Sequence, residues 1–200
     1  MGKKWVLITG STDGIGRQAA YELAQKADYE VIIHGRSEAR CQEAIAWLQD
    51  KLGEKKEFGW VVGDFGKLAS VVQMAEDVKA RFPKLSILLC NAGVLNKKRE
   101  LTADGLEATF QINHLAHFLL ANKLRPLLER NAPSRVILTS SICHSWEEIN
   151  WDDLQAERDY EKYVQYSQSK LMNHLFAFGL HRRLQDAKSG MLFSLQNKIQ

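Results

Sequence analysis

The chain has 200 residues, of which 45% are hydrophobic, and its formal net charge is +3. This length and apolar content suffice for one domain with a substantial core, so we expect a single domain over residues 1–200. Because the positive excess is small and charges of both signs alternate along the chain, the composition argues against a nucleic-acid-binding protein.

The first predicted element is a short apolar strand over residues 6–8, followed by a glycine-rich turn and a helix. The residues of the turn are Gly10, Ser11, Thr12, Asp13, Gly14, Ile15 and Gly16. Glycines without a Cβ let the backbone turn tightly and let a pyrophosphate approach the free N–H groups of a helix N-terminus. A strand, this turn and a helix in that order predict a dinucleotide site, although glycines could also merely close such a turn.

Strands and helices are predicted to alternate along the rest of the chain. Apolar runs indicate strands over residues 30–34, 58–62, 86–90 and 135–139, and residues 191–195 could begin a sixth. Helical spacing indicates helices over 37–52, 67–82, from 102 to beyond a kink at Pro126, and 163–184. This order predicts an α/β fold, a doubly wound, Rossmann-like parallel sheet of five to six strands with helices on both faces.

The end of the second strand bears on the choice of cofactor. In a dinucleotide fold an acidic residue at this place binds the ribose of NAD, whereas an arginine accommodates the 2′-phosphate of NADP. Here the strand ends His34-Gly35-Arg36, without a carboxylate before Glu38. Arg36 therefore favours NADP (NADPH) over NAD, and the alternative is an arginine that is simply solvated in a turn.

Tyr166 and Lys170 stand four residues apart on a predicted helix, so they share one face of it. A tyrosine has an ordinary pKa of about 10, and lowering it to near 7 requires roughly 4 kcal/mol. One cation about 4 Å away at an effective dielectric constant near 20 supplies about that much. The pair is thus suited to proton transfer, although such a spacing also arises by chance.

Five motifs in this order resemble the short-chain dehydrogenase/reductase family, and within it the retinol-dehydrogenase-like branch. They are the glycine turn, Asn91-Ala92-Gly93 after the fourth strand, Asn113-His114 in the long helix, Ser140-Ser141 after the fifth strand, and Tyr166 with Lys170. Together they span about residues 4 to 185.

The resemblance implies a catalytic tetrad of Asn113, Ser141, Tyr166 and Lys170. Tyr166 would exchange the proton with the substrate oxygen, Lys170 would lower its pKa and hold the nicotinamide ribose, and Ser141 would hydrogen-bond the substrate oxygen. Asn113 would position a water that relays protons to Lys170. The further cofactor contacts that the resemblance implies are Asp64, Phe65, Asn91, Ala92 and Gly93.

The implied activity is the NADP-dependent interconversion of an alcohol and its carbonyl, with an apolar substrate such as a retinoid, a steroid or a xenobiotic. Family members usually continue past this length, with a Pro-Gly loop and a substrate lid, so we expect residues 190–200 to diverge and the active site to be incomplete. The alternative is therefore a catalytically impaired, truncated form that binds a partner or has no function. The oligomeric state stays open, although the long helices around residues 106–128 and 171–184 could pair between two subunits in a homodimer.

Three further observations concern location, metals and the polar segment before the last helix. Three cysteines in apolar or turn contexts argue against a disulfide framework and favour a reducing, cytoplasmic location. No apolar run has the length of a transmembrane span, although peripheral attachment to a membrane stays open.

His114 and His117 share a helical face but lack a third ligand, so no metal is expected. Residues 146–151, with two tryptophans, are either a flap over the substrate or a surface for a membrane or partner.

Overall fold

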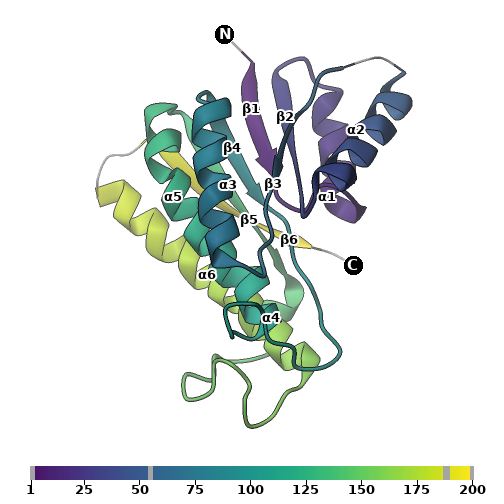
Figure 1. Ribbon diagram of the computed structural model, residues 1–200. Coiled ribbons are helices and arrows are strands. Elements are labelled where there is room, and N and C mark those ends of the chain that lie inside the picture. Colours follow the sequence, from purple (N-terminus) through teal and green to yellow (C-terminus); the bar gives the residue numbers. More distant parts are fainter. Residues whose placement is uncertain (1–2, 54–55, 187–189, 199–200) are drawn as a thin grey trace.

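A computed structural model of the protein describes residues 3–53, 56–186 and 190–198. Its centre is a six-stranded parallel sheet in the order β3-β2-β1-β4-β5-β6 (Figure 1). The strands are β1 (Lys4–Ile8), β2 (Tyr29–Gly35), β3 (Gly59–Val62), β4 (Leu85–Cys90), β5 (Ser134–Ser141) and β6 (Met191–Lys198). The predicted doubly wound parallel sheet is confirmed.

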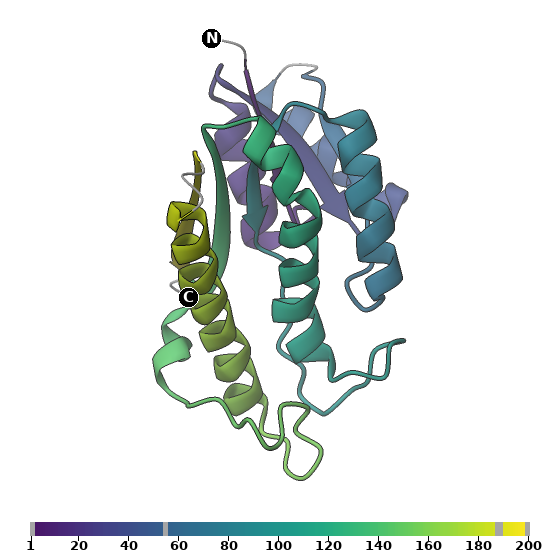
Figure 2. The same ribbon diagram turned by 90° about the vertical axis from the view of Figure 1, so that its left-hand side faces the viewer.

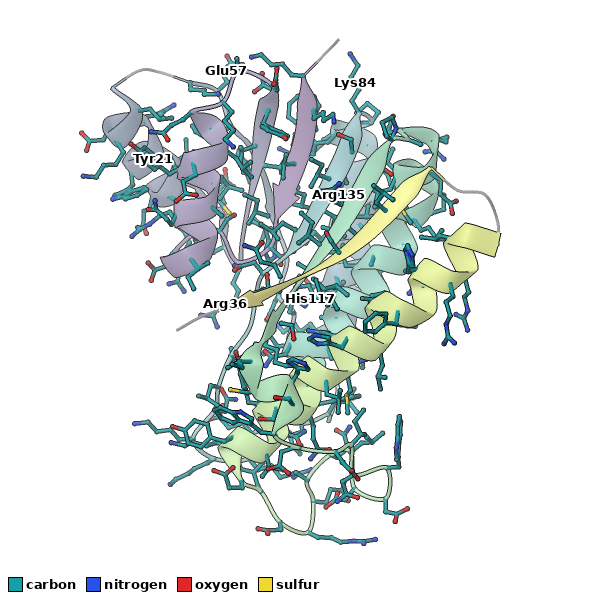
Figure 3. All side chains as sticks on the ribbon, turned by 180° about the vertical axis from the view of Figure 1, so that it is seen from behind. Tyr21, Arg36, Glu57, Lys84, His117 and Arg135 are labelled. Atoms are coloured by element: carbon teal, nitrogen blue, oxygen red, sulfur yellow. The ribbon has the colours of Figure 1, made fainter. Side chains whose placement is uncertain are left out.

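Helices cover both faces of this sheet. On one face lie α1 (Gly14–Ala24) and α2 (Glu38–Leu52), and on the other α3 (Leu68–Arg81), α5 (Ala116–Arg130) and α6 (Lys162–Asp186) stand side by side (Figure 2). The alternation of side chains along a strand explains the two cores, because Val6 and Ile8 pack with α1 and α2 while Leu7 packs with the other helices. Seen from behind, α1 and α2 lie over the β1 side of the sheet, and Arg36 and His117 lie near the ends of its strands (Figure 3).

The helix predicted from residue 102 begins later. Its first turn is α4 (Ala108–Phe110), followed by a π-helical turn, η1 (Gln111–Leu115), and then by α5. The buried carboxylate of Glu107 accepts hydrogen bonds from the backbone N–H groups of Thr109 (2.8 Å) and Phe110 (2.7 Å), and so caps the helix there. Residues 102–105 instead form a turn in which Gly105 has φ +75°.

Residues 191–195, which could begin a sixth strand, do so. β6 pairs in parallel with β5 along its whole length, from Ser134 opposite Met191 to Ser141 opposite Lys198. Residues 196–198 continue the strand. β5 is therefore an inner strand, and the edges of the described sheet are β3 and β6.

The turn after β1 brings two backbone segments unusually close. A Cβ added to Gly16 would lie 2.2 Å from the carbonyl oxygen of Gly10 and 2.5 Å from Nδ2 of Asn91. Gly10 itself has φ +63°, and a Cβ there would lie 2.9 Å from the Cα of Ala92. Only glycine fits at these two positions, so the N-terminus of α1 can pack against the ends of β1 and β4.

Gly16→Ala should therefore destabilise the protein by more than about 2 kcal/mol, because the obstructing atom belongs to the backbone and cannot rotate away. Gly179→Ala in α6 is the matched control, since a Cβ there meets nothing within 4 Å. It should stabilise the helix by roughly 0.5–1 kcal/mol. Urea unfolding of both variants measures the effect, and equal stability of the two would contradict this account of the turn.

Candidate active site

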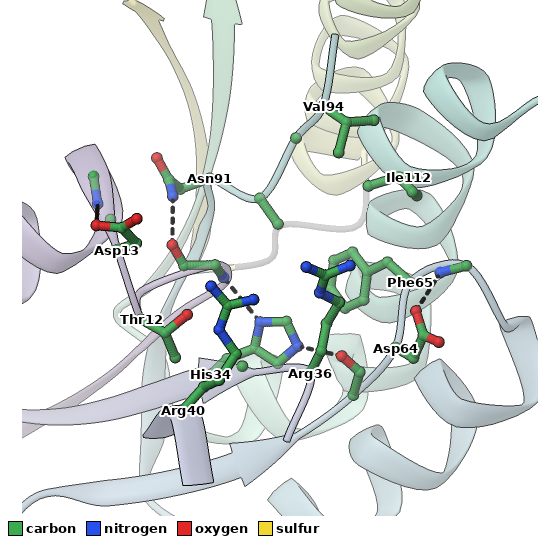
Figure 4. Close-up of a pocket in the computed structure, with 18 of the residues that line it drawn as sticks. Thr12, Asp13, His34, Arg36, Arg40, Asp64, Phe65, Asn91, Val94 and Ile112 are labelled. Carbon is green, nitrogen blue, oxygen red and sulfur yellow. Dashed lines mark hydrogen bonds between the residues drawn. The ribbon is translucent and has the colours of Figure 1, made fainter. Parts of the chain in front are cut away.

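A cavity of about 380 Å³ opens at the ends of β1, β2, β3 and β4, in front of the N-terminus of α1 (Figure 4). It is lined by most of the residues predicted to hold the cofactor: Gly10, Thr12, Asp13, Gly14, Ile15, Gly16, Arg36, Asp64, Phe65, Asn91, Ala92 and Gly93. Ser11 instead lies buried behind the turn, where its Oγ donates to the carbonyl of Ile8 (2.8 Å) and accepts from the N–H of His34 (2.9 Å).

The lining also includes residues that the sequence analysis missed: His34, Gly35, Arg40, Gly63, Gly66, Val94 and Ile112. His34 is the most consequential of them. The N–H of Gly10 donates to its Nδ1 (2.8 Å), so its proton is on Nε2, which donates to the carbonyl of Gly63 (3.1 Å). A histidine inside an apolar strand was the available signal, since a buried imidazole needs such partners.

Burial lowers the pKa of His34 to about 4, although its hydrogen bond to the Gly63 carbonyl acts in the opposite direction. The neutral ring lies 4.8 Å from the ring of Phe65, centroid to centroid. His34 thus ties the glycine turn after β1 to the loop after β3 as an uncharged bridge (Figure 4).

Two arginines stand at the β2 end of the cavity. Arg36 follows β2, and Arg40 lies in the first turn of α2, whose N-cap is Ser37. Both side chains are drawn beside His34 and Thr12 in Figure 4. Two exposed guanidinium groups on one wall can bind a phosphate through charge-assisted hydrogen bonds.

The predicted catalytic side chains come together at the ends of β4 and β5. Ser141, the last residue of β5, lies near the hydroxyl of Tyr166, whose pKa it lowers. The Nζ of Lys170 lies 5.3 Å from the centroid of the Tyr166 ring and donates to the carbonyl of Thr139 (3.1 Å). A Cβ on Gly93 would lie 3.7 Å from this Nζ, so the lysine reaches the cofactor cavity beside the loop after β4.

The charge state of Tyr166 differs from the expectation. Burial raises the pKa of Tyr166 above its ordinary 10, the hydrogen bond with Ser141 lowers it, and nearby Cys143 adds to the rise. The ammonium group of Lys170 donates to the carbonyl of Thr139. The phenol is therefore in its protonated form at neutral pH.

Asn113 occupies the π-helical turn and is fully buried. Its Oδ1 accepts from the N–H of Val94 (2.8 Å), and its Nδ2 donates to the carbonyl of Val94 (3.0 Å) and to Oγ of Ser169 (3.1 Å). The side chain therefore fastens the loop after β4 to α6, next to Lys170.

Residues 146–161 form a long loop before α6, with Trp146 58% and Trp151 71% exposed. Hydrogen bonds fasten this loop on its inner side. Gln155 accepts from Arg99 Nε through its carbonyl (2.9 Å) and from the N–H of Glu107 through Oε1 (2.8 Å), and the hydroxyl of Tyr160 donates to the carbonyl of Asn96 (2.9 Å). The loop is thus anchored to the segment between β4 and α4.

The described residues contain neither a candidate membrane-spanning helix nor a candidate metal site. None of the helices in that part of the chain is both long and apolar enough to cross a membrane. Within the same residues, no three or more His, Cys, Asp and Glu side chains gather where they could hold a metal ion.

Residues 4–187 match the family model of the short chain dehydrogenases. Human retinol dehydrogenase 14 is 39% identical over 194 residues, covering 91% of this chain and 57% of that protein. Human polyprenol dehydrogenase is 36% identical over 183 residues, covering 89% of this chain and 54% of that protein. The chain thus spans little more than half the length of these relatives.

Solved structures give the same fold. An uncharacterized protein from Mycobacterium paratuberculosis superimposes with a TM-score of 0.81 and 32% identity, covering 97% of this chain and 68% of the other. A short chain dehydrogenase from Shigella flexneri in complex with NADP superimposes with a TM-score of 0.76 and 24% identity, covering 98% and 77%. The second similarity supports the fold alone.

The neutral His34 makes stability depend on pH. Its pKa of about 4 lies below the ordinary 6.5, so between these values the unfolded chain binds more protons than the folded protein. Lowering the pH from 7.5 to 5 should therefore cost about 2 kcal/mol of unfolding free energy through His34. His117, whose pKa burial lowers to about 3, acts in the same direction.

His34→Asn removes the titrating group and keeps an acceptor for the N–H of Gly10. The drop in unfolding free energy between pH 7.5 and pH 5, measured with urea, should be smaller in this variant by about 2 kcal/mol. An equal drop in variant and wild type would show that His34 is not the group responsible.

Proposed function

Because the chain belongs to the short-chain dehydrogenase family, we propose that it is an NADP(H)-dependent oxidoreductase that interconverts an apolar alcohol and its carbonyl. One observation carries the proposal. Ser141, Tyr166 and Lys170 converge beside Gly93, on the rim of a cavity whose floor is a glycine turn.

The cavity fits a dinucleotide phosphate. The close approach of Gly16 to Gly10 brings the N-terminus of α1 to the cavity, where backbone N–H groups and the helix dipole favour an anion. The Asp13 carboxylate caps this helix and accepts from the N–H of Gly14 (2.7 Å). Arg36 and Arg40 add two positive charges at the β2 end, which supports NADP(H) over NAD(H). Asp64 and Phe65 would lie along the adenine, and the loop from Asn91 to Gly93 along the adenosine ribose.

When bound, the cofactor supplies or accepts the hydride. In carbonyl reduction the hydroxyl of Tyr166 donates its proton to the substrate oxygen, and a phenol that burial keeps protonated is in the correct form to do so. Ser141, which lies near Tyr166, would hydrogen-bond the same oxygen. Lys170 lies close enough to stabilise the phenolate that this transfer leaves.

The substrate we propose is apolar, such as a retinoid, a steroid or a xenobiotic. Two observations support this class. Ile142 and Trp146, just past the end of β5, are 63% and 58% exposed. Two relatives, retinol dehydrogenase 14 and polyprenol dehydrogenase, are named for apolar alcohols. Residues 146–161 would then form the substrate-side flap.

A cytoplasmic location and a homodimer belong to the same proposal. Exposed apolar side chains on α5 and α6 support pairing of these helices between two copies: Phe118, Leu175 and Phe178. Burying such side chains in an interface would remove apolar surface from water.

Tyr166→Phe should lower kcat for NADPH-dependent carbonyl reduction by more than about 100-fold, because the phenyl ring has no proton to donate. NADPH affinity should stay nearly unchanged. Tyr163→Phe is the matched control, since this tyrosine lies on the same helix and is 48% exposed. The assay is NADPH oxidation with a panel of apolar aldehydes and ketones. No oxidation that depends on Tyr166 would rule out the enzyme and favour the non-catalytic alternative.

Arg36→Asp should reverse the preference for NADPH over NADH, with a change in the ratio of their Kd values of about 100-fold. A charge-assisted hydrogen bond is lost and a like-charge repulsion replaces it. Lys51→Asp makes the same charge change at the far end of α2 and should leave the ratio as it is. An unchanged ratio in Arg36→Asp would remove the basis for the NADP(H) assignment.

A further inference from the structure

A buried histidine that the proposed chemistry does not use links the end of β1 to the helix that carries Asn113. The Nε2 of His117 lies 2.9 Å from Oγ1 of Thr9, and its Nδ1 lies 3.1 Å from the carbonyl oxygen of Asn113. All three residues are at most 1% exposed. Thr9 immediately precedes the glycine turn, so this contact joins the cofactor cavity to the catalytic helices.

The partners fix the direction of each hydrogen bond in this link. Oγ1 of Thr9 accepts from the N–H groups of Asn91 (2.8 Å) and Ala92 (3.0 Å), which occupies both of its lone pairs. Its own proton is therefore donated to Nε2 of His117. Since a carbonyl can only accept, Nδ1 of His117 carries the proton donated to Asn113. The neutral Nδ1–H tautomer satisfies every group in the link.

The surroundings keep this ring uncharged. Burial lowers the pKa of His117 to about 3, and Lys170, His34 and His114 lower it further by repulsion. The edge of the ring packs against Phe65 at 5.1 Å between centroids. A protonated Nε2 could not accept from Thr9, so the link exists only with a neutral imidazole.

The far end of the link reaches α6. The carbonyl of Asn113 also accepts from Nδ2 of Asn173 (3.1 Å), one turn past Lys170, and Oδ1 of Asn173 accepts from Nδ1 of His114 (3.0 Å). The carbonyl thus serves two side-chain donors, one from α5 and one from α6. A π-helical turn makes this arrangement accessible, because it departs from the regular i+4 hydrogen-bonding pattern of an α-helix.

We propose that His117 is a positioning residue that holds the glycine turn at a fixed distance from α6, through Thr9 on one side and the Asn113 carbonyl on the other. The consequence for catalysis rests on the proposed function, in which the turn holds the cofactor and α6 carries Tyr166 and Lys170. The link itself is a property of the folded chain and can be tested without turnover.

The first test measures amide hydrogen exchange and the tautomer of His117 in the protein alone. Thr9→Val removes the hydroxyl at nearly constant shape, and His117→Phe keeps the ring packed on Phe65. Each should speed exchange of the amides of residues 111–117 by about tenfold or more, whereas the amides of α2 should not respond. Thr9→Ser keeps the hydroxyl and should exchange like the wild type.

Imidazole nitrogen NMR should report the Nδ1–H tautomer in the wild type and in Thr9→Ser, and a mixture of tautomers in Thr9→Val. Wild-type exchange in Thr9→Val, or an Nε2–H tautomer in the wild type, would overturn the link. If His117→Phe does not fold, the comparison of Thr9→Val with Thr9→Ser still decides.

The second test measures kcat and NADPH Kd separately. His117→Phe and Thr9→Val should each lower kcat by about 10- to 100-fold with NADPH Kd changed less than about threefold, as expected of a small misplacement of reacting groups. The double variant should be no slower than the slower single variant, because both substitutions cut one link. An effect on Kd alone, or multiplied effects in the double variant, would overturn the positioning role. If the wild type shows no turnover, the proposed function fails while the exchange measurement still decides whether the link exists.

Discussion

The fold of the site depends on one close contact, the packing of the start of α1 against the carbonyl of Gly10. That contact leaves no room for a Cβ on Gly16, and it places the N–H groups at the start of a helix against the end of β1. The turn is then tied on both sides, to β2 through His34 and to the loop after β4 through the hydroxyl of Thr9. The proposed anion site is thus formed almost entirely by backbone atoms. The side chains of His34 and Thr9 fix the position of the turn and do not occupy the site.

Neutral polar side chains do this holding inside an apolar core. A buried polar group without a partner costs roughly 1–3 kcal/mol, so each must be satisfied. His34 and His117 meet this requirement through opposite tautomers, because His34 accepts at Nδ1 and His117 accepts at Nε2. The same principle applies to Asn113, whose side chain bonds both polar groups of the Val94 backbone. Such contacts are directional, so they define distances between strands and helices more sharply than apolar packing does.

The parts that the sequence predicted are those governed by local pattern. Apolar runs placed the strands, and the glycine turn was recognised from its place between a strand and a helix. The errors arose where distant residues decide. Glu107 starts its helix six residues after the predicted position because its carboxylate is buried against Gln165 of α6. Arg40 and His34 were missed for the same reason, since their place on the cavity follows from tertiary packing. The roles assigned to Asn113, Ser141, Tyr166 and Lys170 are still predictions.

The pKa of Tyr166 bears differently on the two directions of the proposed proton transfer. Each pKa unit corresponds to about 1.36 kcal/mol, so the rise that burial causes must be overcome before the phenol can act as a base. A cation within about 4 Å of the phenol oxygen could overcome it. The ammonium of Lys170 lies 5.3 Å from the ring centroid and donates to the carbonyl of Thr139. Alcohol oxidation would depend on how strongly this ammonium stabilises the phenolate. Carbonyl reduction needs only the proton that burial keeps on the Tyr166 hydroxyl. The position of Lys170 therefore matters more when Tyr166 acts as a base, in alcohol oxidation, than when it acts as an acid.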